Sequence, residues 1–80
     1  MLQELKTSKK VVGIKQLRKA LREGTVIRAF VADNADPRLT APVEEACAAN
    51  AIPLERVSTM AQLGTACSIE VGAAVAAIVR

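Results

Sequence analysis

The sequence predicts an α/β fold in which helices cover both faces of a small sheet. β-branched segments alternate along the chain with segments whose apolar residues have helical spacing. The longest apolar run, Val71 to Val79, is typical of a strand buried on both faces. The chain has 80 residues, of which 51% are hydrophobic, so one core can form without covalent cross-links. We therefore expect a single domain over residues 1–80.

The N-terminal part is expected to hold a β-branched step and the clearest helix of the chain. A polar lead-in at residues 4–8 precedes Val11 and Val12, which form the step and end at Gly13. From Ile14 to Glu23 the apolar residues form one helical stripe, and Gly24 supplies the stop. The stripe comprises Ile14, Leu17, Ala20 and Leu21, and the opposite face collects Lys15, Arg18, Lys19 and Arg22.

The middle of the chain predicts a strand, a turn and a second helix. Thr25 to Ala32 is β-branched and partly alternating, which favours a strand, and Asp33-Asn34 follows it as a turn. Asp36-Pro37 is expected to open a turn, with Thr40 as the N-cap of the next helix and Pro42 in its first turn. The buried stripe of that helix is predicted to be Leu39, Val43, Ala46 and Cys47.

The C-terminal part predicts two strands around a short helix. Asn50 can close the preceding helix in the left-handed conformation. Ile52 to Val57 contains an early proline, so we expect a strand near a sheet edge. Thr59 can cap a short helix over Met60 to Ala66. Val71 to Val79 is rich in alanine, which favours helix, but the alternation of strands and helices before it favours a strand.

The composition excludes several kinds of chemistry. The chain has no His, which removes an imidazole base and a His-paired nucleophile. Phe30 is the only aromatic residue. Proteins of the RRM or OB type bind single-stranded nucleic acid by stacking its bases on several aromatic side chains, so these classes are nearly excluded. Cys47 and Cys67 are singletons, so neither a zinc knuckle nor a redox Cys-x-x-Cys is present. We expect no enzyme, no catalytic residue, no cofactor and no metal, and we interpret Asp33 and Asp36 as turn residues.

The charge of the chain is unevenly distributed. Residues 1–28 hold eight bases and two acids, a net charge of +6, whereas residues 29–80 hold three bases and six acids, a net charge of −3. A one-sided basic region indicates a polyanionic partner, although it can also be a solvated face. The N-terminus lacks the apolar run of a signal peptide, and no apolar stretch approaches the ~20 residues of a membrane span. We expect a cytoplasmic protein with no membrane partner.

Two local groupings can carry a binding function. A β-step that runs through Gly13 into a helix leaves unpaired backbone N–H groups at a positive helix end. Lys15 and Lys19 lie one turn apart with Gln16 beside them, so this face can contact base edges and phosphates, or it is simply a basic solvated face. In the second grouping, Ile69-Glu70-Val71 can form an apolar lid for an unstacked base, although at least one of its two apolar residues is expected to pack into the core.

Three motifs in this order resemble the L-seven-Ae family of ribosomal proteins, which bind kink-turn RNA, and especially its small bacterial ribosomal-protein-like branch. The resemblance covers nearly the full length and implies a three-layer α/β/α sandwich with a four-stranded mixed sheet. It also implies a monomer that binds a kink-turn in structured RNA, such as ribosomal RNA, with or without the ribosome, or a riboswitch. The motifs are Gly13-x-Lys15-Gln16-x-x-Lys19-Ala20-Leu21, Val31-Ala32-Asp33-Asn34-Ala35-Asp36-Pro37 and Leu63-Gly64-x-Ala66-Cys67-Ser68-Ile69-Glu70-Val71-Gly72-Ala73-Ala74.

The resemblance further implies a binding mode, in which the helix that begins at Gly13 enters the widened major groove at the tandem sheared G·A pairs. The loop would then cover the nucleotide extruded at the kink. Archaeal and eukaryotic members carry Asn-Glu where this chain has Lys15-Gln16, so we expect more salt-sensitive binding. Ser68 stands where Gly is common, so its backbone is less free to adopt a positive φ. The RNA-binding residues implied are Gly13, Lys15, Gln16, Lys19 and Arg22 of the helix and Ile69, Glu70 and Val71 of the loop.

The alternative function is a protein-interaction or ribosome-assembly adaptor in which RNA binding is lost or secondary. The acidic surface of residues 29–80 would then bind the protein partner. The acids concerned are Asp33, Asp36, Glu44 and Glu45.

Overall fold

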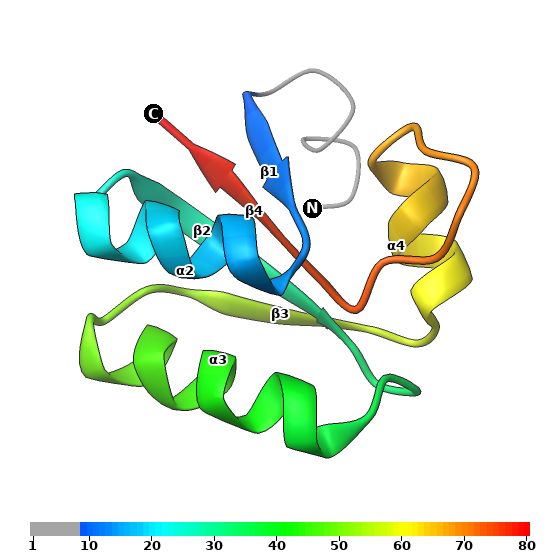
Figure 1. Cartoon of the computed structure of the whole chain (residues 1–80), viewed down its shortest axis with the longest axis horizontal. Coiled ribbons are helices and arrows are strands. Elements are labelled where there is room, and N and C mark those ends of the chain that lie inside the picture. Colours follow the sequence, from blue (N-terminus) through cyan, green and yellow to red (C-terminus); the bar gives the residue numbers. More distant parts are fainter. Residues whose placement is uncertain (1–8) are drawn as a thin grey trace.

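A four-stranded mixed sheet forms the centre of this computed structural model, which describes residues 9–80 (Figure 1). The spatial order of the strands is β1-β4-β2-β3. β2 runs parallel to β3 and antiparallel to β4, and β4 also pairs antiparallel with β1. The polar lead-in expected at residues 4–8 lies outside the described residues. The strands are β1 (Lys10–Val12), β2 (Val26–Ala32), β3 (Leu54–Val57) and β4 (Val75–Val79).

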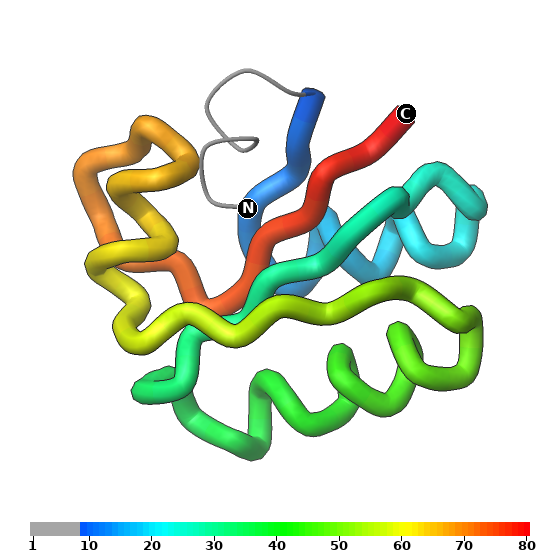
Figure 2. The backbone as a smooth tube through the Cα atoms, turned by 180° about the vertical axis from the view of Figure 1, so that it is seen from behind, coloured from blue at the N-terminus to red at the C-terminus, as the bar shows by residue number. Residues whose placement is uncertain are grey.

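Helices cover both faces of the sheet, which confirms the three-layer sandwich. Helices α2 (Ile14–Glu23) and α3 (Pro37–Ala49) pack on one face, where Leu17 and Val43 share a core with β2 and β4. The shorter α4 (Met60–Ala66) packs on the other face, where Leu63 meets Phe30 in a second core (Figures 1 and 2). Because the sheet separates the two cores, each helix layer is anchored independently by its own apolar side chains.

The elements with strong local signals lie where the sequence predicts them. α2 has the predicted bounds, and Gly24 ends it in the left-handed conformation at φ 70°. β3 begins directly after Pro53 and forms an edge of the sheet. Thr59 caps α4, because its Oγ1 accepts a hydrogen bond from the Gln62 backbone N–H at 3.1 Å.

The final apolar run, Val71 to Val79, contains a strand, as predicted. The strand β4 covers only the last five residues of that run. All five residues of β4 are buried, because β4 lies between β1 and β2 with core on both faces. The small alanine side chains suit this position, and the packing overrides their preference for helix. The strand begins only at Val75, since residues 67–74 connect α4 to the sheet.

The start of α3 corrects the sequence prediction, because its N-cap is Asp36 rather than Thr40. The Asp36 Oδ1 accepts a hydrogen bond from the Arg38 backbone N–H at 2.9 Å, and Pro37 occupies the first helical position. Proline fits there because its fixed φ is helical and the N–H it lacks would be unpaired anyway. Thr40 is instead a buried residue inside the helix, and Pro42 lies in the helix interior rather than in its first turn.

The buried face of α3 also differs from the expected stripe. Leu39 was expected to be buried, but its side chain is 51% exposed. The inward positions are Thr40, Val43 and Cys47, which follow one another at helical spacing. Leu39 therefore lies on the exposed side of the helix, and Thr40 is buried instead of Leu39.

The end of α3 uses Ala51 as its left-handed residue, whereas Asn50 was expected there. Asn50 has φ −103° and Ala51 has φ 55°. The Ile52 N–H donates to the Cys47 carbonyl at 2.9 Å and the Ala51 N–H donates to the Ala48 carbonyl at 3.2 Å, which is a Schellman arrangement. The Asn50 side chain instead donates from Nδ2 to the carbonyl of Ala46 at 2.7 Å, so it satisfies a terminal carbonyl without adopting a positive φ.

Candidate nucleic-acid interface

The start of α2 presents backbone donors to solvent. Gly13 has φ 99°, a conformation that glycine adopts without strain, and an added Cβ would have no neighbour within 4 Å. Its N–H donates to the Val75 carbonyl at 3.0 Å, and its carbonyl accepts the first helical hydrogen bond from Leu17 at 3.0 Å. No side chain caps this end, so the N–H groups of Ile14, Lys15 and Gln16 precede the helical ladder. The positive end of the helix is therefore open to an anion or an acceptor.

The polar face of α2 carries positive charge that no described residue neutralises. Its side chains are exposed, and within residues 9–80 none of them forms a hydrogen bond or an ion pair. The face is available to a partner without breaking an existing contact. It comprises Lys15, Gln16, Arg18, Lys19 and Arg22.

The arginines on α3 and β3 are, in contrast, paired with carboxylates. Arg38 Nη2 lies 2.8 Å from Asp36 Oδ2, and this guanidinium lowers the pKa of the Asp36 carboxyl. Arg56 pairs with Asp33 at 3.1 Å and also with Glu44. Among residues 9–80, the cations that form no ion pair are thus found mainly on α2, so the uneven charge of the sequence is also uneven in space.

The connection from α4 to β4 exposes the second predicted grouping. Glu70 and Val71 are exposed, with Val71 at 69%, whereas Ile69 is half-buried and packs against the core beneath α4. This confirms that one of the two apolar residues packs inward. Ser68 does adopt the positive φ that its side chain disfavours, at 63°.

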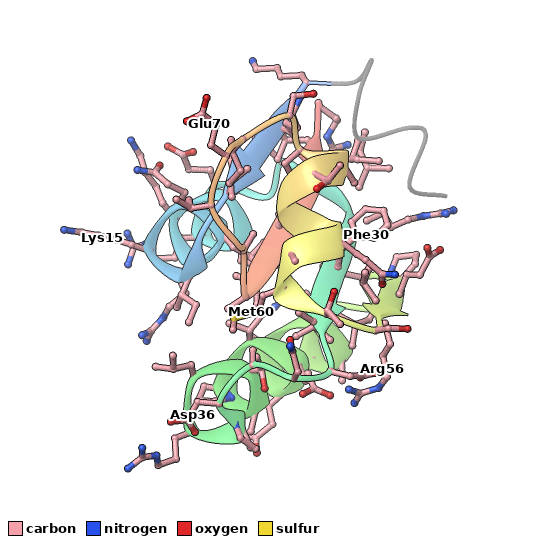
Figure 3. The ribbon with its side chains drawn as sticks, turned by 90° about the vertical axis from the view of Figure 1, so that its right-hand side faces the viewer. Lys15, Phe30, Asp36, Arg56, Met60 and Glu70 are labelled. Carbon is pink, nitrogen blue, oxygen red and sulfur yellow. The ribbon has the colours of Figure 1, made fainter. Side chains whose placement is uncertain are left out.

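The fold brings the start of α2 and the predicted loop to one end of the sheet, whereas Arg22 lies near the other end of α2, toward Thr25 and Arg80. The first residue of β4, Val75, accepts a hydrogen bond from the N–H of Gly13, the residue that precedes α2, and the loop carrying Glu70 leads directly into β4. Figure 3 shows the Lys15 and Glu70 side chains projecting outward, away from the protein interior. The start of α2 and the loop consequently lie at the same end of the sheet. Ile69 contributes by anchoring the loop rather than by offering a free side chain.

A groove between α2 and α3 was not apparent from the sequence. A hollow of about 530 Å³ is lined by Ile14, Lys15, Arg18, Arg22 and Leu39. A neighbouring hollow of about 420 Å³ shares Arg18 and Arg22. The only signal in the sequence was the helical spacing of the two arginines on the basic face, because Leu39 comes from a helix distant in sequence and was expected to be buried.

The cysteines are buried, and the acidic side chains of the described residues form no metal-binding group. Among residues 9–80, no group of three or more His, Cys, Asp or Glu side chains could hold a metal ion. Cys47 and Cys67 are buried free thiols, and burial raises the pKa of each, which makes a thiolate less accessible. No helix in the same part of the chain is long and apolar enough to cross a membrane.

Comparisons with known proteins match this chain to one family over its whole length. A model described as "Ribosomal protein L7Ae/L30e/S12e/Gadd45 family" matches residues 1–80. An RNA-binding protein of Geobacillus sp. strain WCH70 is 45% identical over 76 residues, which are 95% of this chain and 93% of the relative. The RNA-binding protein YbxF of Geobacillus stearothermophilus is 41% identical with the same coverage.

Two solved structures share the fold. The Giardia lamblia 15.5kD RNA binding protein superposes with a TM-score of 0.91 at 24% identity, covering 99% of this chain and 70% of that one. A protein with unknown function from Bacillus halodurans has a TM-score of 0.86 at 20% identity, covering 99% of this chain and 83% of that one. At these identities the likeness concerns the fold alone.

Proposed function

This chain belongs to the ribosomal protein L7Ae/L30e/S12e/Gadd45 family, and on that basis we propose that it binds structured RNA by recognising kink-turns and stabilising their bent form. The observation that carries the proposal is the unpaired basic face of α2, which begins at an open helix end beside an exposed loop. The name "RNA-binding protein" given to the relatives supports the same partner.

The shape of RNA explains why the helix needs a kinked partner. The major groove of a regular RNA duplex is too deep and narrow for side chains to read the bases. A kink that opens this groove at sheared G·A pairs would admit the end of α2. Lys15, Gln16 and Lys19 would then contact the purines, and Gly13 would let the backbone approach closely because no Cβ stands there. Arg22, one turn after Arg18, would attract the phosphates.

The loop supplies the second part of the proposed contact. Val71, an apolar side chain that is 69% exposed, would cover the nucleotide extruded at the kink, with Ile69 holding the loop against the protein core. Glu70 repels phosphates and accepts hydrogen bonds only, so it would favour base amino groups over the RNA backbone. An exposed apolar residue beside an acid suits an unstacked base better than a regular stem.

The adaptor alternative is weaker, because most of the acidic face is already occupied. Asp36 is bound to Arg38, and Asp33 and Glu44 are both bound to Arg56, which leaves only Glu45 of the four acids without an ion pair in the described part. In our proposal the chain is a single RNA-binding domain that acts as a cytoplasmic monomer without enzymatic activity or cofactor. Its targets are ribosomal RNA, bound on the ribosome or apart from it, or a riboswitch.

Equilibrium titration against two RNAs tests the proposal. The first RNA is a stem with a kink-turn, and the second is the same stem with its G·A pairs replaced by Watson–Crick pairs. We expect the kink-turn to bind at least about tenfold more tightly, because loss of each base contact typically costs ~1–3 kcal/mol. Equal affinity for both RNAs would contradict kink-turn recognition while leaving general RNA binding possible.

A further inference from the structure

The loop that follows α4 lies directly on the helix at Gly64. A Cβ added at Gly64 would lie 2.1 Å from the Val71 carbonyl oxygen, 3.1 Å from its carbonyl carbon and 3.2 Å from the Gly72 Cα. All three atoms belong to the backbone, so no rotation of a side chain could relieve the contact. The position of Val71 therefore depends on the missing side chain of Gly64.

A second close approach lies one turn earlier on α4, at Met60. A Cβ added at Gly72 would lie 3.1 Å from the Met60 Cβ and 3.4 Å from its carbonyl group. The Ala73 N–H donates to the Met60 carbonyl at 3.0 Å, and the Met60 N–H donates to Asn34 Oδ1 at 2.7 Å. Met60 thus connects the end of the loop to the turn after β2, and Figure 3 shows it at the lower end of α4.

The beginning of the loop is fixed to the same helix. The Ile69 N–H donates to the Gly64 carbonyl at 3.0 Å, and the Ser68 N–H donates to the Thr65 carbonyl at 3.0 Å. These two bonds form a Schellman arrangement with Ser68 as the left-handed residue. The exposed residues Glu70 and Val71 are consequently held from both sides, with α4 as their support.

We propose that Gly64 and Gly72 are positioning residues that determine the specificity of this protein for kinked RNA, by seating the loop on α4 at one fixed place relative to α2. This inference rests on the proposed function. The positive face of α2 and the loop are separately supported, because α2 is anchored through Leu17 on the opposite face of the sheet from α4. Displacing the loop would therefore reduce discrimination between RNAs and leave the general attraction to RNA in place.

The substitution Gly64→Ala tests this separation directly. We expect the kink-turn affinity to fall about tenfold or more, while the affinity for the Watson–Crick stem changes less than about twofold. Thr65→Ala is the matched control, since it changes the next, exposed residue of α4 and should keep the wild-type ratio of affinities. Far-UV circular dichroism of both variants reports whether the sandwich is folded.

If Gly64→Ala prevents folding, Gly72→Ala and its combination with Met60→Gly test the same role of the glycines. Gly72→Ala introduces a milder contact whose nearest atom is the Met60 Cβ, and Met60→Gly removes that atom. We expect Gly72→Ala to reduce the ratio of the kink-turn affinity to the affinity for the Watson–Crick stem, and the double variant to recover part of that ratio.

A folded Gly64→Ala or Gly72→Ala protein with the wild-type ratio of these affinities would overturn the role of the glycines. Wild-type protein that binds both RNAs equally would instead contradict the proposed function.

Discussion

Replacing Lys19 by alanine is expected to weaken binding to a kink-turn RNA by about 1–3 kcal/mol, or about 5- to 150-fold. Lys19 lies one helical turn after Lys15 on the exposed face of α2, and no carboxylate in the described part neutralises it. Its ammonium group is therefore free to enter the RNA groove. Titration at several salt concentrations measures the effect, and the slope of log K against log salt should decrease by up to about one if Lys19 also neutralises a phosphate.

Arg38→Ala is the control for a general charge effect. It removes the same unit of positive charge, but Arg38 lies on α3 and is bound to Asp36. Both substitutions lower the net charge by one unit, so a purely long-range attraction would weaken by a similar amount in the two variants. We expect a change of less than about twofold at physiological salt, since exposed charges beyond ~8 Å are largely screened. An equal loss in both variants would contradict a specific role for Lys19.

Leu17→Ala is expected to lower the free energy of unfolding by about 2–5 kcal/mol. The Leu17 side chain has no solvent exposure and anchors α2 in the core that it shares with α3 and the sheet. Small domains are stable by only ~5–15 kcal/mol, so this loss is a large part of the total. Urea unfolding followed by circular dichroism measures it as a lower midpoint.

Leu39→Ala makes the same chemical change at a position that is 51% exposed. Since the side chain is already half in water and leaves little cavity, we expect a loss below about 1 kcal/mol. The comparison tests the orientation of α3, because the sequence pattern placed Leu39 in the core. A loss at Leu39 as large as that at Leu17 would mean that the orientation described for α3 is wrong.

The accuracy of the sequence predictions follows from how local each signal is. The stripe of α2 and its glycine stop lie within one segment, so its bounds could be predicted without reference to the rest of the fold. The sequence of α3 contains two possible starts, Asp36-Pro37 and Thr40, and the predicted N-cap at Thr40 is wrong. The burial of Thr40 depends on how α3 packs in the whole fold, which no local pattern contains.

The candidate site was predictable in composition but not in its electrostatics. The sequence showed that bases collect on the helix from Ile14 to Glu23. Only the structure shows that Arg38 and Arg56 are paired with carboxylates, whereas no carboxylate of residues 9–80 pairs with the bases of α2. The seating of Val71 on Gly64 was also hidden, because it depends on a turn that brings the loop back onto its own helix. The assignment of RNA contacts to individual residues stays a prediction.

The bending of a labelled RNA tests whether this protein stabilises the kinked form of a kink-turn. A kink-turn RNA carries a donor fluorophore at the end of one stem and an acceptor at the end of the other, in low-salt buffer without divalent ions, where phosphate repulsion favours the extended form. We expect a saturable rise in energy transfer as the protein is added, and no rise for the stem in which Watson–Crick pairs replace the G·A pairs. Saturating protein that leaves the kink-turn RNA extended would contradict this stabilisation.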